Sequence, residues 1–317
     1  MPCQTSTRRG SGRFHRRICL AAPSRYVLIP PAQVFHPADN LLHALTVDVE
    51  DWPQSTLDHS LPITERAVRN TYRLLELFGR HGVRGTFFVL GLLAEKFPRL
   101  VADIAAEGHE VASHGYSHRA VFHIGPEGFV DELKRSVQLL EDITGQPVRG
   151  YRAPDFSITA RSLWALDLLA QHGLQYDSSI FPLKLRRYGI AGFPRGIHRR
   201  PNGLVEVPLS TVSWAGRRWP VAGGGYFRLY PYALTRLAVA RLQAEGQPAI
   251  VYVHPYEVDP AELRELAWPM SFRTRVTQGL NRRFVAGRLG RLLNDFRFGP
   301  IADVLRQSVP EHGRQPV

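Results

Sequence analysis

Between residues 43 and 180 the sequence alternates between short apolar runs and stretches in which apolar residues recur every three to four positions. Short continuous apolar runs are typical of strands buried on both faces, whereas the wider spacing predicts amphipathic helices. We predict helices over 65–81, 92–106, 126–144 and 162–172. Strands and helices that alternate over short links favour a parallel sheet with right-handed crossovers. The sequence therefore predicts an α/β fold.

After about residue 180 this alternation loosens. Residues 181–203 are rich in Pro, Gly and Arg, as is typical of a loop, and the clearly buried run PAIVYVHPYE comes only later. From Pro260 onward the pattern is helical and basic. We therefore predict three parts: a disordered basic segment over 1–40, a main domain over 41–260, and a helical extension over 261–317 that packs on this domain.

The formal net charge of +12 is concentrated at the two ends of the chain. Residues 1–40 and residues 261–317 each carry a net charge of +5, so the domain between them is close to neutral. A nucleic-acid-binding module needs a basic patch with interleaved aromatic residues, and the sequence shows none. We predict no nucleic-acid partner.

The two cysteines, Cys3 and Cys19, both precede the main domain. A domain without cysteine excludes thiolate metal ligands, a cysteine nucleophile and a disulfide framework. No apolar run approaches the roughly 18 residues of a membrane helix, and the N-terminal segment lacks the apolar centre of a secretion signal. We expect a cytoplasmic protein with no integral membrane segment, and peripheral attachment to the inner membrane is the alternative.

Polar residues follow four of the apolar runs at the point where each run ends. They are Asp48, Glu50 and Asp51 in TVDVED, His114 and His118 in SHGYSH, Arg152 in YRAPDF, and His254 in VYVHPYE. Ligands of parallel α/β folds collect at the carboxyl ends of the strands. Each residue alone has an ordinary explanation, such as a solvated turn or a core histidine, but their recurrence at strand ends predicts one site.

Two histidines four residues apart can reach a single cation, and one carboxylate completes a set of two histidines and one acid. This set leaves a position open for water, as a catalytic zinc or another hydrolytic divalent ion requires. Glu50 shares a strand face with Asp48, but Asp51 can turn inward if the strand ends at Val49. We favour Asp51 as the third ligand and keep Glu50 as the alternative. Asp48 is then free to act as a base, and Arg152 can pair with it.

These four motifs, in this order and spacing, resemble those of the polysaccharide deacetylases with NodB homology, the carbohydrate esterase 4-like enzymes. The resemblance covers residues 43–259. It implies a distorted (β/α) barrel of about seven parallel strands, and a hydrolase that removes N-acetyl groups from the amino sugars of a glycan. It also implies a divalent metal, for which we expect Zn²⁺, with Co²⁺ or Ni²⁺ as alternatives. On this chain it implies Asp48 as general base, His114 and His118 as metal ligands, Arg152 as the partner of Asp48, and His254 as general acid.

The segments GGGYFRLYPY, HPYEVDP and RLLNDFRFGPIADVL resemble a subgroup found with bacterial exopolysaccharide and exosortase gene clusters. One departure concerns the first motif, because the family usually has two adjacent aspartates where this chain has Val49 and Glu50 before Asp51. The alternatives are a peptidoglycan or ureide-type amidohydrolase of the same superfamily and a glycan-binding homologue with weak activity.

Several residues near these motifs are candidates for contact with the sugar, since aromatic faces stack on pyranose rings and glycine allows close backbone approach. They are Tyr151, Pro154, Phe156, Asp177, Trp214, Gly224 and Tyr226. Each of these aromatic residues, taken singly, is more typical of a core position than of a sugar contact. Asp177 is also a candidate for a carboxylate beside His254, where it would raise the pKa of the imidazole.

Overall fold

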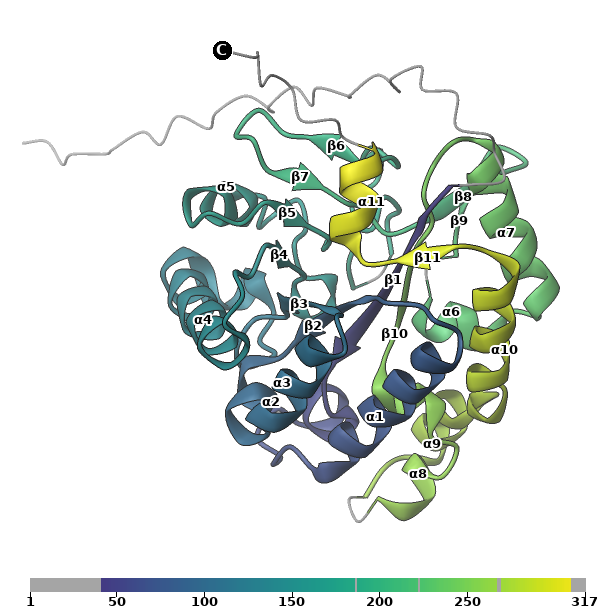
Figure 1. Ribbon diagram of the computed structural model, residues 1–317, viewed down its shortest axis with the longest axis horizontal. Coiled ribbons are helices and arrows are strands. Elements are labelled where there is room, and N and C mark those ends of the chain that lie inside the picture. Colours follow the sequence, from purple (N-terminus) through teal and green to yellow (C-terminus); the bar gives the residue numbers. More distant parts are fainter. Residues whose placement is uncertain (1–40, 186, 222, 267–268, 309–317) are drawn as a thin grey trace, which may run out of the picture.

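The structure is a computed structural model, and it describes residues 41–308 except 186, 222, 267 and 268. In this part of the chain, nine strands form one curved sheet in the order β10-β1-β2-β3-β4-β5-β7-β6, with β11 also paired to β1 (Figure 1). A separate hairpin consists of β8 and β9. The strands are β1 His43–Val49, β2 Thr86–Val89, β3 Glu110–Ser113, β4 Gly150–Tyr151, β5 Tyr176–Asp177, β6 His198–Arg199, β7 Val205–Glu206, β8 Thr211–Trp214, β9 Arg217–Pro220, β10 Ile250–Val253 and β11 Phe298–Gly299.

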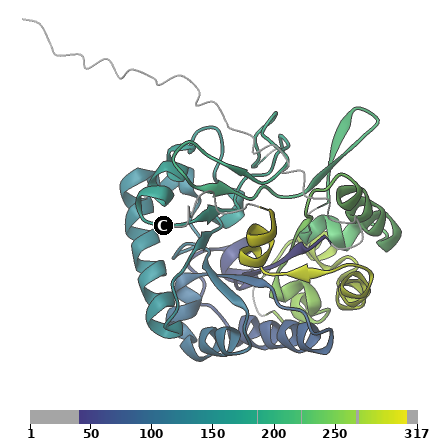
Figure 2. The same ribbon diagram turned by 45° about the horizontal axis from the view of Figure 1, so that its top comes forward.

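Helices cover the curved sheet, most of them along its outer side, while α11 lies near the centre of the ring (Figure 2). They are α1 Glu65–Arg80, α2 Gly91–Lys96, α3 Pro98–Ala106, α4 Val121–Thr144, α5 Trp164–Gln171, α6 Gly224–Leu229, α7 Tyr232–Ala244, α8 Glu262–Glu265, α9 Phe272–Gly279, α10 Arg282–Asp295 and α11 Ile301–Ser308. Three shorter turns of helix are η2 Pro53–Leu57, η3 Pro154–Phe156 and η4 Pro255–Val258. The turns η3 and η4 directly follow the YRA and VYVH segments, so they form part of the strand-end region.

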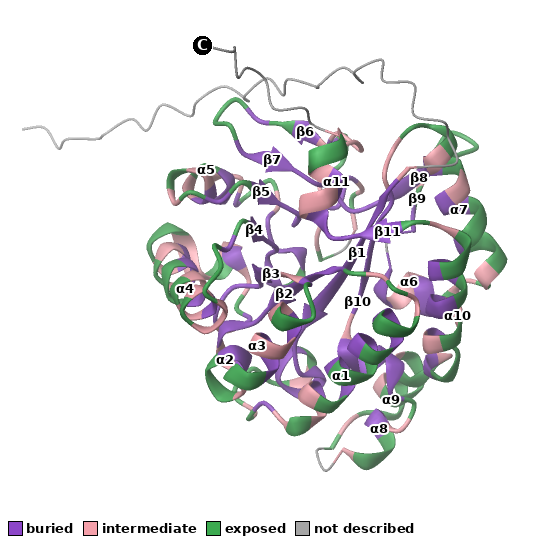
Figure 3. Ribbon diagram, in the orientation of Figure 1, coloured by how far each residue is buried: buried purple, intermediate pink, exposed green. Residues whose placement is uncertain are grey.

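Strand β1 lies at the centre of the fold, and every one of its residues is buried (Figure 3). It pairs in parallel with β10 through Ala44↔Ile250 and with β2 through Thr46↔Thr86. Because β1 has strands and helices packed around it, its apolar run needs no polar face. The predicted α/β fold with a barrel-like, mostly parallel sheet is confirmed. In the described residues, β6 is the antiparallel exception, because it returns from β7 as a hairpin.

The predicted helices are present with adjusted ends. Thr64 caps α1 as expected, with its side chain accepting a hydrogen bond from the Arg66 amide. The helix expected over 92–106 is divided into α2 and α3 at Phe97, because Pro98 cannot donate the hydrogen bond that would continue it. The helix expected from residue 126 begins earlier, at Val121, and bends at Gly125, whose φ is 71°.

The C-terminal segment follows β10 as the helices α8 to α11, and the two-residue strand β11 returns to the start of β1 through His43↔Phe298. The buried faces of α10 and α11 belong to the hydrophobic core of the fold. They contribute Val285, Leu289, Leu292 and Ile301, all of which are buried. None of the helices within the described residues combines the length and apolar character needed to cross a bilayer. The prediction of disorder for residues 1–40 lies outside the described residues.

Candidate metal centre and catalytic groups

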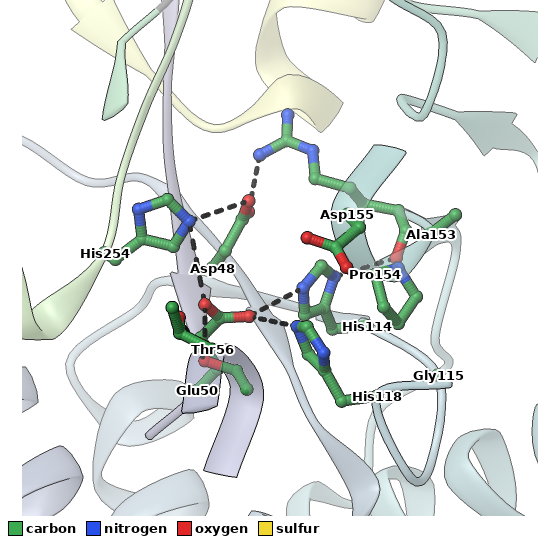
Figure 4. A network of polar contacts seen from close by, with 12 residues as sticks. Asp48, Glu50, Thr56, His114, Gly115, His118, Ala153, Pro154, Asp155 and His254 are labelled. Carbon is green, nitrogen blue, oxygen red and sulfur yellow. Dashed lines mark hydrogen bonds and ion pairs between the residues drawn. The ribbon is translucent and has the colours of Figure 1, made fainter. Parts of the chain in front are cut away.

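The carboxyl ends of β1, β3, β4 and β10 bring the residues of the four motifs together (Figure 4). Asp48 is the penultimate residue of β1, while His114, Arg152 and His254 each directly follow a strand. Parallel strands end at the same edge of the sheet, so short strands with polar exits converge on one place. The sequence-predicted residues Asp48, Glu50, His114, His118, Arg152 and His254 therefore share one site.

Glu50, His114 and His118 form a buried cluster whose candidate ligand atoms all lie within 4.8 Å of one another. Glu50 Oε2 is 2.5 Å from His118 Nε2 and 3.4 Å from His114 Nε2. Burial alone would raise the pKa of Glu50, but the nearby histidines, His118 above all, bring it well below its usual value. The same carboxylate raises the pKa of His118 against the opposing effect of burial. Negative charge in this pocket thus requires a proton or a cation beside it.

The contacts of the Nδ1 atoms of His114 and His118 indicate that the Nε2 atoms of the cluster can bind a cation. His114 Nδ1 lies 2.8 Å from the carbonyl oxygen of Arg152, so the Nδ1–H donates and Nε2 keeps its lone pair toward Glu50. A lone pair facing a carboxylate at 3.4 Å is unfavourable unless positive charge lies between them. His118 Nδ1 is buried and has no hydrogen-bond partner among the described residues. Two histidines and one carboxylate are the donor set of many catalytic zinc sites.

Asp51, which we favoured as the third ligand, points elsewhere. Its two carboxylate oxygens accept hydrogen bonds from the Thr64 amide and the Thr64 hydroxyl, at 2.7 and 3.1 Å. Burial raises the pKa of Asp51 to about 6, and the Thr64 bonds partly offset this. Glu50 keeps the strand alternation beyond Val49 and lies on the same side as Asp48. The geometry therefore favours the alternative, Glu50, and gives Asp51 a role in fixing the start of α1.

Asp48 and Arg152 form a fully buried ion pair beside the cluster. Arg152 Nη1 donates to Asp48 Oδ1 at 2.7 Å and also to Thr46 Oγ1 at 2.7 Å. The rest of the guanidinium donates to the backbone carbonyl and the hydroxyl of Ser178. Its plane lies over the Phe88 ring, 4.1 Å from the ring centroid. With all these donors used, Arg152 holds Asp48 in one orientation and leaves Asp48 Oδ2 on the side of His254.

His254 completes the site from the opposite side, as Figure 4 shows. Its Nε2 lies 4.0 Å from Asp48 Oδ2 and 3.8 Å from Glu50 Oε1. Its Nδ1 lies 3.2 Å from Glu257 Oε2, and Glu257 also accepts from the His254 amide. Burial would lower the pKa of His254, but Glu257, Glu50 and Asp48 raise it to about 9. The imidazole therefore carries a proton at neutral pH in this arrangement.

Two family models match consecutive parts of the chain. Residues 44–176 match the family "Polysaccharide deacetylase". Residues 178–306 match a domain of unknown function, DUF3473. We use the name deacetylase domain for the matched segment 44–176. It contains Asp48, Glu50, both histidines of the cluster and Arg152, whereas His254 lies in the second region.

The relatives with curated names match only part of the chain. A peptidoglycan deacetylase of Helicobacter pylori is 37% identical over 110 residues, 34% of this chain and 36% of that protein. A peptidoglycan-N-acetylglucosamine deacetylase of Bacillus cereus is 33% identical over 31% of this chain and 36% of its own length. A chitooligosaccharide deacetylase of Rhizobium leguminosarum is 31% identical over 31% and 51%. The matched part is thus about a third to a half of each relative.

Solved structures share the fold over nearly the whole chain. A Mycobacterium smegmatis protein assigned to the polysaccharide deacetylases superposes with a TM-score of 0.62 over 90% of this chain and 95% of its own, at 20% identity. The Puue allantoinase superposes with a TM-score of 0.59 over 89% and 95%, at 14% identity. At such identities the likeness shows the fold alone. The fold therefore extends beyond the deacetylase domain and includes the DUF3473 region.

The candidate sugar contacts lie in several different places. Tyr151 is buried against Phe129, and Phe156 is buried against Tyr252, so both have partners inside the protein. Pro154 lies beside His114 (Figure 4), and Tyr226 is half-buried near Phe181.

The remaining candidates lie apart from the cluster. Trp214 is half-exposed on the β8–β9 hairpin. Gly224 begins α6 with φ of 52°, where a Cβ would come within 2.8 Å of the Tyr252 ring.

Asp177 is not the carboxylate beside His254. It is fully buried, and its side chain accepts hydrogen bonds from the amide and hydroxyl of Ser179. Burial raises its pKa to about 6. Glu257 takes the expected place beside His254, because η4 turns the chain immediately after Pro255 and returns Glu257 to the imidazole three residues later. The sequence signal for this contact is the short spacing between His254 and Glu257 within HPYE.

Proposed function

We propose that this protein removes N-acetyl groups from amino sugars of a bacterial exopolysaccharide or its precursor. The observation that carries the proposal is the convergence of three units at one edge of the sheet. They are the Glu50–His114–His118 cluster, the Asp48–Arg152 ion pair and the His254–Glu257 pair. Amide hydrolysis needs an activated water, stabilisation of the oxyanion and a proton for the leaving amine. Each requirement has a matching unit in this arrangement.

Glu50, His114 and His118 would hold the divalent ion through one carboxylate oxygen and two Nε2 atoms. When bound, such an ion lowers the pKa of water and polarises the acetyl carbonyl. The donor set suits Zn²⁺, and Co²⁺ or Ni²⁺ are alternatives with similar ligand preferences. Ser55 donates to Glu50 Oε1 at 3.1 Å, which would steady the carboxylate while its other oxygen faces the histidines.

Asp48 would accept the proton of the nucleophilic water. Its Oδ1 is held by Arg152, so Oδ2 is the oxygen available for this proton. The guanidinium prevents the carboxylate from rotating. A buried base that is held in this way loses little entropy when the reaction begins.

His254 would protonate the leaving nitrogen. Its Nδ1 faces Glu257, so Nε2 is the atom that points into the site between Asp48 and Glu50. An amine leaves poorly as an anion, and a charged imidazole next to the scissile bond supplies the missing proton. The side chain is 16% exposed, compared with 2% for Asp48, which leaves an approach for substrate on this side.

The substrate class follows from the named relatives together with this chemistry. The names of the relatives refer to peptidoglycan, to N-acetylglucosamine and to chitooligosaccharides, which all contain N-acetylated amino sugars. The narrower assignment to an exopolysaccharide comes from the subgroup motifs of the C-terminal region.

The test is acetate release by the purified, metal-loaded protein from chitooligosaccharides and from de-esterified bacterial exopolysaccharide, with allantoin as the comparison substrate. We expect acetate from an N-acetylated glycan and no hydrolysis of allantoin. Hydrolysis of allantoin with no acetate from any glycan would overturn the proposal. A binder without catalysis would retain the oligosaccharide and release no acetate, which also contradicts it.

A further inference from the structure

The helix α9 exposes an apolar stripe that nothing in the described residues covers. No residue of α9 is buried. Phe272 is 83% exposed, Val276 is 46% exposed and Leu280, directly after the helix, is 48% exposed. These positions are four residues apart, so they lie on one face of the helix. Phe284, on the first turn of the next helix, α10, is 43% exposed. A solvated helix would not normally present an aromatic and two aliphatic residues in line.

The segment that carries this stripe is strongly cationic. Residues 269–294 contain six arginines and no aspartate or glutamate. One of them, Arg282, is buried and donates to backbone carbonyls, so it fixes the local fold. Arg273, Arg275 and Arg283 are exposed, and among the described residues they form no salt bridge with a carboxylate. Their charge is therefore available to an anionic partner.

We propose that α9 and the start of α10 dock the protein on an anionic lipid bilayer. A short helix with an apolar face and flanking arginines lies in the plane of a membrane interface, where the apolar side chains enter the boundary of the acyl chains. Each arginine near an anionic surface adds to the attraction. Phe272 supplies the deepest apolar contact, and Arg273, Arg275 and Arg283 supply the charge.

A second exposed apolar surface, on α7, provides the contrast. Leu234 and Leu237 are 47% and 48% exposed, which matches Val276 and Leu280. The arginines on the same helix are paired, however: Arg236 with Asp295 and Arg241 with Glu245. The α7 surface therefore has the apolar character without the free positive charge. Charge complementarity to anionic lipid distinguishes α9.

The carboxyl end of α9 is tied to the catalytic site. Arg228 donates to the carbonyl oxygens of Gln278 and Thr277, and its Nη1 lies 3.9 Å from Glu257 Oε1. Glu257 in turn contacts His254. Figure 1 shows α9 between α8 and α10 at the edge of the molecule. Docking through α9 would hold the site close to the membrane surface, and, on the basis of the proposed function, a membrane-attached glycan would then be the substrate class.

The experiment measures co-sedimentation of the full chain with vesicles of phosphatidylcholine containing 30% phosphatidylglycerol, and with pure phosphatidylcholine vesicles. We expect at least about tenfold tighter binding to the anionic vesicles, and a weakening when salt is raised from 0.1 to 0.5 M. F272S/V276S/L280S should lose this binding by tenfold or more, and R273Q/R275Q/R283Q should remove the preference for anionic lipid. The matched control, L234S/L237S, should bind as the parent chain does.

The readout is independent of catalysis, so it separates this proposal from the proposed function. Thermal unfolding of each variant shows that the fold is retained, as is expected for exposed positions. Equal binding by the α9 variant and the parent would overturn the proposal, as would absence of vesicle binding. Association with a second copy of the chain or with a DNA duplex through these residues, without vesicle binding, would also overturn it.

Discussion

The deacetylase domain and the DUF3473 region contribute to the same site in different ways. In residues 44–176 the strands β1, β2 and β3 are four to seven residues long and pair in register, and they position Asp48, Glu50 and the two histidines in full burial. In residues 178–306 only β10 is a comparable strand of the main sheet, and it presents His254 with more solvent access.

This difference indicates that the two regions have different functions in the site. The first region contributes the buried Glu50–His114–His118 cluster and the Asp48–Arg152 ion pair. The second region contributes His254, whose pKa is raised by Glu257 together with Glu50 and Asp48. Substitution of the three proposed ligands in the first region should therefore remove metal together with activity, whereas substitution of His254 or Glu257 in the second should leave the metal and change proton transfer.

The largest effect is expected in the cluster. His114→Ala removes one of three ligands, so we expect metal content to fall from about one ion per chain to a small fraction, with activity at background. Glu50→Gln should also lose metal, because a neutral amide is a weak ligand, while Asp51→Asn should retain it. Elemental analysis of the purified proteins measures this directly. Metal loss in Asp51→Asn with retention in Glu50→Gln would move the third ligand back to Asp51.

A smaller effect is expected from His254→Ala. This variant should keep its metal and its affinity for an N-acetylated oligosaccharide, while turnover falls by roughly a hundredfold to ten-thousandfold, as is typical for loss of a general acid. An acetyl ester of the same sugar has a better leaving group and should be less affected. Equal losses on amide and ester, or loss of metal, would assign His254 to structure or coordination.

Some of the residues behind these two predictions could be identified from the sequence, and others could not. Asp48, His114, His118, Arg152 and His254 could be placed in one site because each closes an apolar run, and parallel strands end at one edge. We favoured Asp51 over Glu50 from the sequence, whereas the geometry favours Glu50, because the choice depends on where β1 stops and on the hydrogen bonds between Thr64 and Asp51. Thr64 lies at the start of the following helix, α1, and the apolar pattern of the strand gives no information about its position.

Glu257 illustrates a second limit. Its contact with His254 depends on the tight turn η4 after Pro255, and turn geometry of this kind is weakly encoded in residue spacing. Asp177 was a candidate for the same role, but its side chain accepts hydrogen bonds from Ser179. The fold could be predicted from the sequence more readily than these contacts. Burial and periodicity are properties of many residues, whereas a single contact depends on one rotamer.

Glu257→Gln tests the protonation of His254 with an intermediate expected effect. The neighbouring carboxylates raise the pKa of His254 to about 9, so the charged donor is present below that pH and lost above it. Removal of the Glu257 charge lowers this pKa, and the alkaline limb of the rate profile should move to lower pH. Turnover below pH 7 should fall much less than in His254→Ala. The pH dependence of kcat for both proteins measures the shift, and an unchanged alkaline limb would contradict the pairing.

The smallest effect concerns the partner of Asp51, and it separates structure from chemistry within the deacetylase domain. The Thr64 hydroxyl both donates to Asp51 and accepts from the Arg66 amide at the start of α1. Thr64→Ala removes both bonds, so we expect a loss of about 1 kcal/mol in the free energy of unfolding. Thr64→Ser restores the hydroxyl and should recover most of this stability. Metal content and turnover per folded molecule should stay unchanged in both variants, because Asp51 supports α1 and does not bind the ion. A loss of metal in Thr64→Ala that Thr64→Ser restores would show instead that the Asp51 contact shapes the metal centre.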